Sequence, residues 1–374
     1  MQKSSGKRAR IEVPTTTTSS TITTSSTTST SSGQGHNKEE EAAALMLPAV
    51  SSLYGGLPAP RDLVPLVSLP APCVSPSLCV SPSLCVSPSL YAMAPLGLHL
   101  VGPFEVLSGK HLGGALSGPP PQLLHLHWRY WYDPPELQTV ARGDSDSQTH
   151  LGYYRDSPGE LPVFVGESVA SRGCTITPLG DNIFAALKCV ADRKIRSAKS
   201  TSSKSSSTSS IASISSVRDA LIATATRLGF SLETKSPSIA ARNKRVVSRL
   251  FHGAGIVVPV DDKDVGYREL PHSPAELRRL CEAVVRCEDD AGRVAAFAPL
   301  QELSTLVQFA NDESDYGMGL EFGLNLFCHG SHFFHKLAGR TLRLSYSLLK
   351  RDAFGDIVSA HLAQRSRQPL NLLP

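Results

Sequence analysis

Ser273-Pro-Ala-Glu-Leu-Arg-Arg-Leu-Cys-Glu-Ala-Val-Val285 is the stretch of this 374-residue sequence with the clearest structural pattern. Ser273 and Glu276 form the Ser-x-x-Glu pattern of a capping box, and Pro274 fills the first helical position. The apolar residues that follow share one face of a helix: Leu277, Leu280, Cys281, Val284 and Val285. The stretch therefore predicts an amphipathic helix that packs on a core.

The chain around this helix also favours helices. Upstream, Ser216 with Asp219 is typical of a helix start, and Gly229 of a helix end. Downstream, Pro299 is expected to open a helical segment that could turn extended near Phe309. Its apolar residues at helical spacing are Leu300, Leu303 and Val307. At least two more helices are expected in residues 331–364, so this half of the chain is predicted to be rich in helices.

The first half of the chain carries strand patterns instead. Apolar and polar residues alternate from Leu124 to Trp131, and period two predicts a strand. Further short strands are expected at Leu137–Val140, Gly152–Tyr154 and Val163–Val165, which would form an antiparallel meander. Asp181 is expected to cap a helix after the last strand. Strands followed by helices predict an α+β fold with a strand-rich N-terminal lobe and a helix-rich C-terminal lobe.

Low-complexity stretches suggest where the lobes begin and end. Residues 1–95 are expected to be mostly disordered, because Ser/Thr runs and a thrice-repeated Cys-Val-Ser-Pro-Ser-Leu offer little to bury. The strand-rich lobe then covers residues 96–196, a Ser-rich linker or loop covers 197–215, and the helix-rich lobe covers 216–374. The disordered tail at the N-terminus shows no secretory leader.

Bulk properties exclude some classes of protein. Hydrophobic residues make up 41% of the chain, enough for a sizeable core, and the net charge of +4 does not by itself imply nucleic acid. Residues 63–104 lack Asp, Glu, Lys and Arg, but their frequent prolines argue against a membrane span. No membrane association is therefore expected.

Phe309-Ala-Asn-Asp-Glu-Ser-Asp-Tyr-Gly-Met-Gly319 is the segment that could carry chemistry. It places Asp312, Glu313 and Asp315 within four residues, and Gly317 with Gly319 would let the backbone turn sharply. If the preceding segment is helical, the carboxylates lie at its C-terminal end, which disfavours negative charge and makes a carboxylate there a plausible general base. A solvated acidic turn is the alternative. The spacing does not fit an EF-hand, which needs Gly at the sixth position and Glu at the twelfth.

Other polar clusters are weaker candidates. His329, His332 and His335 recur every three residues, but without His-Glu-x-x-His the spacing is poor evidence for a metal, and none is expected. Arg268, on a turn, could offer its planar guanidinium to a carboxylate. The basic run Arg242–Arg249 is a candidate for DNA binding. Nucleotide-binding fingerprints are absent from the sequence, so no cofactor is expected to bind this chain alone.

Several segments together resemble the histone PARylation factors. The longest are Val265-Gly-Tyr-Arg-Glu-Leu-Pro271 and Gln308-Phe-Ala-Asn-Asp-Glu-Ser-Asp-Tyr-Gly-Met-Gly-Leu-Glu321. Shorter ones precede them in order: Leu98-His-Leu-Val-Gly-Pro-Phe104, His125-Leu-His-Trp-Arg-Tyr130, Tyr132-Asp-Pro-Pro-Glu-Leu-Gln-Thr139, Gly152-Tyr-Tyr-Arg-Asp-Ser-Pro158, Gly180-Asp-Asn-Ile-Phe-Ala-Ala186 and Phe251-His-Gly-Ala-Gly255. The resemblance runs from about Leu96 to Ala363.

This resemblance implies a two-lobed protein that is not an enzyme alone. Such a factor docks on the catalytic domain of a nuclear poly(ADP-ribose) polymerase, which holds NAD. It supplies one glutamate, here Glu313, to a joint active site for serine ADP-ribosylation of histones in the DNA damage response. The resemblance also implies location in the nucleus, on chromatin at DNA breaks, and the acidic surface would attract basic histone tails. Sequence-specific binding to nucleic acid is not expected.

The resemblance assigns further residues to partner binding. Tyr267 and Arg268 match a docking motif, in which Arg268 would grip a carboxylate at the polymerase's C-terminus. Asp312 would contact the polymerase, and Phe309 and Ser314 flank the acidic pair. Ser314 stands where the family is expected to carry Cys. Outside these motifs, Lys336 is expected at the rim of the joint site.

Three other functions remain open. The chain could be a non-catalytic docking module that recruits basic histone tails to a nuclear partner. It could be a metal-dependent hydrolase that uses Asp312, Glu313, Asp315 and the histidines. It could also bind DNA directly through Arg242–Arg249, with strong salt dependence.

Overall fold

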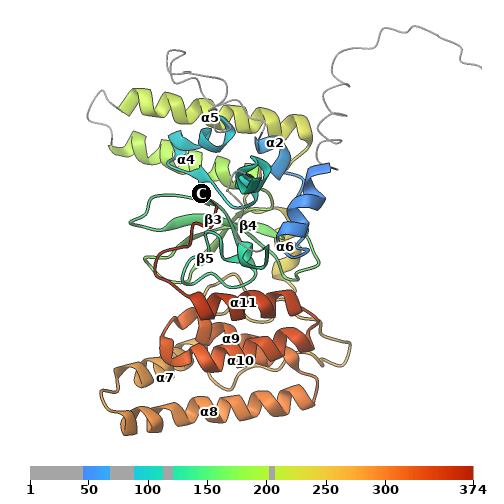
Figure 1. The fold of residues 1–374 in the computed structure, drawn as a ribbon, viewed down its shortest axis with the longest axis vertical. Coiled ribbons are helices and arrows are strands. Elements are labelled where there is room, and N and C mark those ends of the chain that lie inside the picture. Colours follow the sequence, from blue (N-terminus) through green and yellow to red (C-terminus); the bar gives the residue numbers. More distant parts are fainter. Residues whose placement is uncertain (1–44, 68–87, 113–120, 202–206, 374) are drawn as a thin grey trace, which may run out of the picture.

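The computed structural model describes residues 45–67, 88–112, 121–201 and 207–373 of the chain. Its architecture is α+β: one antiparallel sheet lies in the middle, with helices on both sides of it (Figure 1). The predicted fold class is confirmed. Of residues 1–95, which were expected to be mostly disordered, residues 1–44 lie outside the described part.

The sheet has five strands that follow one another in chain order, each antiparallel to the next. The strands are β1 (His99–Leu100), β2 (Leu137–Arg142), β3 (Thr149–Tyr154), β4 (Phe164–Val169) and β5 (Ile176–Gly180). The predicted strands near residues 137, 152 and 163 are confirmed, as is the meander. Such a meander needs only short connections between neighbours.

The strand predicted from Leu124 to Trp131 is wrong. Residues 121–126 form the 3-10 helix η5, and His127 makes only an isolated bridge to Leu370. Polar His127 and Arg129 are as buried as their apolar neighbours, because each finds an interior partner. The His127 imidazole contacts the Glu105 carboxylate, and the Arg129 guanidinium donates to backbone carbonyls. The alternation therefore does not separate a core face from a solvent face.

Helices α4 (Ile183–Thr201) and α5 (Ser207–Leu228) pack together and cover one side of the sheet (Figure 1). The linker expected at residues 197–215 is therefore mostly helical, with only 202–206 outside the described residues. The helix expected to open at Ser216 starts earlier, although it ends before Gly229 as predicted. Asn182, not Asp181, caps α4, because its Oδ1 accepts the Ala185 N–H at 3.0 Å.

Part of the N-terminal region expected to be disordered is folded on this lobe. Residues 45–53 are helical, and α2 (Leu63–Val67), η2 (Pro88–Tyr91) and η3 (Ala94–Leu96) follow. Leu63 and Leu66 have no exposed surface, because they pack in the same core as the sheet and α4. The prolines between 58 and 95 keep these elements short but do not prevent burial. The rest of residues 1–95 lies outside the described part.

The C-terminal lobe is a stack of helices on the opposite side of the sheet (Figure 1). Its helices are α7 (Pro274–Arg286), α8 (Asp290–Asp312), α9 (Tyr316–His329), α10 (His335–Leu348) and α11 (Asp352–Gln364). The helix predicted after Ser273 is confirmed with its capping box, and so are the two helices beyond residue 331. Helix α9 lies at the centre, buried from Gly317 to Cys328.

Two predictions about this lobe are wrong. Pro299 does not open a helix: it lies inside α8, which begins at Asp290 and stays helical to Asp312. Gly317 and Gly319 do not turn the backbone, because both lie in α9. They allow close packing instead. A Cβ at residue 319 would lie 2.6 Å from the Ser345 Oγ on α10.

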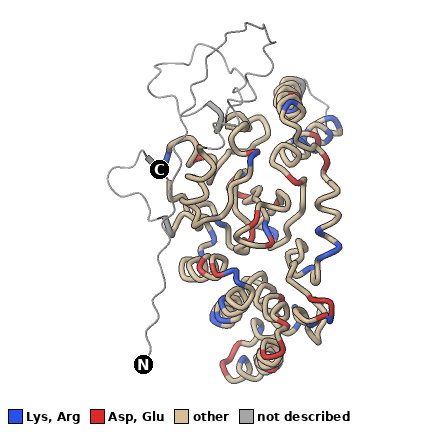
Figure 2. The backbone as a smooth tube through the Cα atoms, turned by 90° about the vertical axis from the view of Figure 1, so that its right-hand side faces the viewer, with Lys and Arg blue, Asp and Glu red and all other residues tan. Residues whose placement is uncertain are grey.

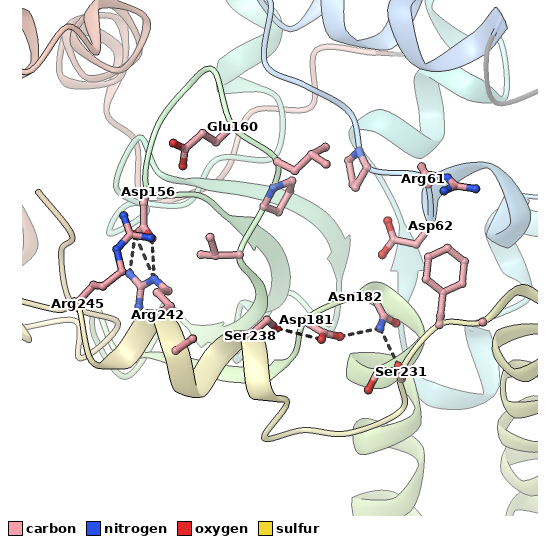
Figure 3. A pocket seen from close by; sticks show the side chains of 17 residues that line it. Arg61, Asp62, Asp156, Glu160, Asp181, Asn182, Ser231, Ser238, Arg242 and Arg245 are labelled. Atoms are coloured by element: carbon pink, nitrogen blue, oxygen red, sulfur yellow. Dashed lines mark hydrogen bonds and ion pairs between the residues drawn. The ribbon is translucent and has the colours of Figure 1, made fainter. Parts of the chain in front are cut away.

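Buried polar contacts tie the two lobes together. On α6 (Pro237–Asn243), Arg242 is buried and donates to Asp156 and to the carbonyls of Ala254 and Gly255 (Figure 3). Arg242–Arg249 is therefore not a continuous exposed basic surface, and basic and acidic positions are interspersed along the described chain (Figure 2). After this run, Ser248 and Ile256 form an isolated antiparallel bridge.

Candidate functional site

The acidic turn joins the end of α8 to the start of α9. Asp312 is the last residue of α8, and Glu313 is its C-cap. The Asp315 N–H donates to the Ala310 carbonyl at 2.8 Å, and the Ser314 N–H donates to the Asn311 carbonyl at 3.1 Å. These two bonds make a Schellman motif, in which Ser314 takes the left-handed conformation with φ of 68°. The turn thus holds Asp312, Glu313 and Ser314 exposed at fixed positions.

The segment 266–268 is fixed against this turn by backbone groups. The Gly266 N–H donates to the Asp315 Oδ1 at 2.9 Å, and the Gly317 N–H donates to the Gly266 carbonyl at 2.9 Å. Only glycine fits at 266, because φ is 132° and a Cβ would lie 2.1 Å from the Pro259 carbonyl oxygen. Asp315 itself is 7% exposed. It is therefore the anchor of the segment and not a free acid.

Tyr267 anchors the same segment from its side chain. Its hydroxyl donates to the Glu321 Oε2 at 2.8 Å, and the Ser248 hydroxyl donates to the Glu321 Oε1 at 2.8 Å. Burial raises the pKa of the Glu321 carboxyl, and these two hydrogen bonds oppose that rise. Burial also raises the pKa of the Tyr267 hydroxyl, so it remains a donor at neutral pH. Because Tyr267 is partly buried and its hydroxyl is hydrogen-bonded, it fixes the position of the next residue, Arg268.

Arg268 brings the two predicted motifs into contact. Its Nη2 contacts the Glu313 carboxylate through Oε2 and lies 2.9 Å from the Asp315 Oδ2. The Arg268 and Glu313 side chains are 45% and 60% exposed, so water screens their attraction. The hydrogen bond to Glu313 raises the pKa of the guanidinium. Among the described residues, none donates to the Glu313 Oε1, which leaves this oxygen open to a proton donor.

Comparison with known proteins gives the family. The family model described as histone PARylation factor 1 matches residues 79–365. This chain belongs to the histone PARylation factors. A Danio rerio protein named Histone PARylation factor 1 is 55% identical over 278 residues, which cover 74% of this chain and 77% of the relative. The Bos taurus protein of that name is 52% identical over 280 residues, covering 75% and 78%.

The structure brings together most of the residues predicted for the site of this histone PARylation factor. Phe309 lies in the last turn of α8, Asp312, Glu313 and Ser314 follow it on the exposed acidic turn, and Arg268 reaches that turn from the segment 266–268. Phe309 is 56% exposed although it is a large apolar residue, as a contact residue would be. The anchoring roles of Asp315 and Gly266 were not predicted from the sequence. For Asp315, the available signal was a third carboxylate beside Asp312 and Glu313.

Lys336 lies away from this turn. It stands in the first turn of α10, whereas Glu313 precedes the start of α9. The two helices are antiparallel, since Gly319 packs on Ser345 and Gly323 packs on Leu342. The length of α9, 14 residues, therefore separates Lys336 from Glu313, which is roughly 20 Å at 1.5 Å per residue.

The other candidate clusters have a different geometry. His329 ends α9, His332 lies in η6 (His332–Phe334) and His335 begins α10, so the three do not share a helical face. Within the described ranges, no group of three or more His, Cys, Asp or Glu is placed to hold a metal ion. Likewise, no helix in that part of the chain has the length and apolar character needed to cross a membrane.

A cavity of about 580 Å³ between α6, the start of α4 and the loop after β3 is lined by both acids and bases (Figure 3). Arg242 pairs there with Asp156, and Asp181 accepts from Asn182 and Ser238. These lining groups mostly satisfy one another, so their arrangement is explained by the packing of α6 against the N-terminal lobe.

Proposed function

We propose that this chain docks on the catalytic domain of a nuclear poly(ADP-ribose) polymerase at DNA breaks and completes its active site for serine ADP-ribosylation of histones. The observation that carries the proposal is the contact between Arg268 and Glu313 on an exposed turn. It places the residue proposed for docking beside the residue proposed for catalysis. NAD would be held by the polymerase, and this chain would supply one carboxylate.

Glu313 would act as the general base, because its exposed carboxylate lies on a fixed turn. A serine hydroxyl is a weak nucleophile until its proton is removed. In the proposed step, the Glu313 carboxylate takes the serine proton while the Oγ bonds to the anomeric carbon of the nicotinamide ribose. The bond from that carbon to nicotinamide breaks, and nicotinamide leaves with the electron pair. Proton removal by a placed carboxylate contributes on the order of 10²–10⁴ in rate.

Docking would change the contacts of Arg268. Its guanidinium is shared between two carboxylates of this chain, and a carboxylate at the partner's C-terminus could compete for it. Asp315 would keep the segment in place through the Gly266 N–H while Arg268 turns away. Glu313 would then lose its contact with the guanidinium, and both of its carboxylate oxygens would be open to the serine hydroxyl. Asp312, Phe309 and Ser314 would supply the rest of a modest contact surface.

The test is a reconstituted transfer assay with the polymerase catalytic domain, NAD, a Lys-Ser histone peptide and the full chain. We expect serine-linked product with the native chain. With Glu313→Gln, we expect at least about a hundredfold less product, because Gln cannot accept the proton. Docking of this variant, measured separately by titration calorimetry, should change little. Glu302→Gln is the matched control, because Glu302 is an exposed glutamate on α8, the helix that Glu313 caps.

A second pair of variants tests docking. Arg268→Ala should weaken binding to the polymerase and lower product through that loss. Arg343→Ala removes another exposed arginine from an ion pair, with Asp356, and should change neither. Equal product from Glu313→Gln and the native chain would refute the general base and leave a docking module that recruits basic histone tails.

A further inference from the structure

A separate cavity of about 340 Å³ lies at the C-terminal end of α9, between the two lobes. It is lined by Trp131 and Tyr132 from the N-terminal lobe, by His329, His332 and Phe333 at the α9–α10 turn, and by Arg367 near the C-terminus. Its size is within the range of small-molecule sites. None of the described residues that line it is acidic.

Arg367 presents a guanidinium that is positioned but not neutralised. Its Cζ lies 4.1 Å from the centre of the Trp131 ring, so the planar group rests on the indole. The residue is exposed, and no acceptor among the described residues takes a hydrogen bond from its guanidinium. Two hydrogen bonds hold Trp131 in place. Its Nε1–H donates to the Gly330 carbonyl, and the Arg365 Nε–H donates to the Trp131 carbonyl. A stacked, unpaired arginine is suited to bidentate contact with a phosphate.

The other walls offer flat rings. The His332 and Phe333 ring centres are 4.1 Å apart, and both rings are at least partly exposed. Burial lowers the pKa of His329, so its imidazole adds no positive charge to this wall at pH 7. Its Nδ1 is buried and has no partner in the described structure, so the ring and not this atom faces a ligand. Lys336 follows one turn after His332 and adds positive charge nearby.

We propose that this cavity binds a nucleoside diphosphate, with the base among the rings and the diphosphate on Arg367. The choice of ADP-ribose among such ligands rests on the proposed function. Because α9 separates the cavity from Glu313 by roughly 20 Å, it would hold an ADP-ribosyl group already transferred and not the reacting NAD. The chain would thereby retain modified product through its own residues.

Titration calorimetry of the full chain, without the polymerase, tests this site. ADP-ribose and ADP should bind saturably. Adenosine and inorganic pyrophosphate should each bind at least about tenfold more weakly, because each lacks one half of the recognised group. Arg367→Ala should weaken ADP-ribose binding by at least about tenfold through the lost charged hydrogen bonds. Arg245→Ala removes an equally exposed arginine beside the other cavity and should leave the affinity unchanged.

The His332→Ala variant is a second test of the cavity, because it removes an exposed ring and leaves Arg367 in place. It should weaken ADP-ribose and leave pyrophosphate unchanged. Failure of ADP-ribose to bind saturably, equal affinity for pyrophosphate and ADP, or unchanged binding by a folded Arg367→Ala variant would each overturn the proposal. None of these outcomes depends on transfer or docking, so this site and the role of Glu313 can fail independently.

Discussion

At the scale of single residues, the acidic turn is built on a conformation that its central residue disfavours. Ser314 holds φ at 68°, where a Cβ meets the neighbouring backbone and glycine is the usual choice. Its backbone N–H nevertheless completes the Schellman motif that presents Glu313. Among the described residues, the serine side chain makes a single 3.4 Å contact, with the Tyr316 hydroxyl. No strong contact of the serine hydroxyl in that part of the chain therefore offsets the strain.

Ser314→Gly should raise the free energy of unfolding by up to about 1 kcal/mol, because glycine adopts the left-handed conformation without steric cost. Chemical denaturation at constant pH measures this change. Ser314→Ala keeps the Cβ and should give little or no gain. Destabilisation by glycine would show that the serine side chain supports the turn after all.

The acidic residues of this turn could be predicted from the sequence, but the contacts that they make could not. Asp312 and Glu313 stand out because carboxylates so close together are conspicuous in any sequence. The contact between Arg268 and Glu313 joins residues 45 positions apart, and no local pattern encodes such a pairing. The role of Asp315 depends likewise on where the Gly266 N–H lies. Three-dimensional packing alone supplies that information.

At the scale of elements, α8 shows how tertiary packing overrides a local signal. Proline lacks the N–H of an internal helical residue and clashes with the preceding turn, so it favours the first helical position. In α8 it lies well inside the helix, with Asp289 capping the true start through the Gly292 N–H. Four buried residues beyond the proline hold the helix in register: Leu300, Leu303, Val307 and Ala310. Their burial offsets the cost of the proline.

Pro299→Ala should raise the free energy of unfolding by about 1–3 kcal/mol, because it restores a backbone donor and removes the clash. Pro274→Ala is the matched control at the first position of α7, where proline is well tolerated, and should change stability little. Thermal unfolding of both variants beside the native chain measures the difference. An equal response of the two variants would mean that α8 is already adapted to its proline.

At the scale of the whole molecule, the lobes are joined by buried polar groups as well as by apolar packing. The Tyr346 hydroxyl on α10 donates to the Glu136 carboxylate before β2, and Arg242 on α6 donates to the Asp156 carboxylate after β3. Burial raises the pKa of Glu136, which the tyrosine hydrogen bond opposes. The sequence predicted an α+β fold and a meander because periodicity is local. It did not predict these joints, which pair positions far apart in the chain.

Asp62 makes a similar joint between the N-terminal segment and the rest of its lobe. Its carboxylate accepts from the Tyr153 hydroxyl on β3 and from the Ile183 N–H at the start of α4. Burial raises the pKa of this carboxyl from 3.8 to about 6, despite those two hydrogen bonds. The folded state therefore binds a proton at a pH where the unfolded state has released it. Glu105 is the opposite case: burial raises its pKa, but contacts with His127 and Lys110 outweigh burial and lower it overall.

These shifts predict opposite contributions to the pH dependence of stability. For Asp62, the folded state holds more protons between about pH 4 and pH 6, so its contribution is most favourable at low pH and declines as pH rises through 6. Asp62→Asn removes this titration. The stability of the native chain minus that of the variant should therefore fall by about 1–3 kcal/mol from pH 4 to pH 7. For Glu105→Gln the same difference should rise with pH up to about 4.5 and then stay level, because below that pH the folded state has released a proton that the unfolded state still holds. Urea denaturation of all three proteins from about pH 3 to pH 7 measures both slopes. If the difference in stability between the native chain and Asp62→Asn did not change with pH, water would have access to the Asp62 carboxylate. The N-terminal segment would then not bury this group against the sheet.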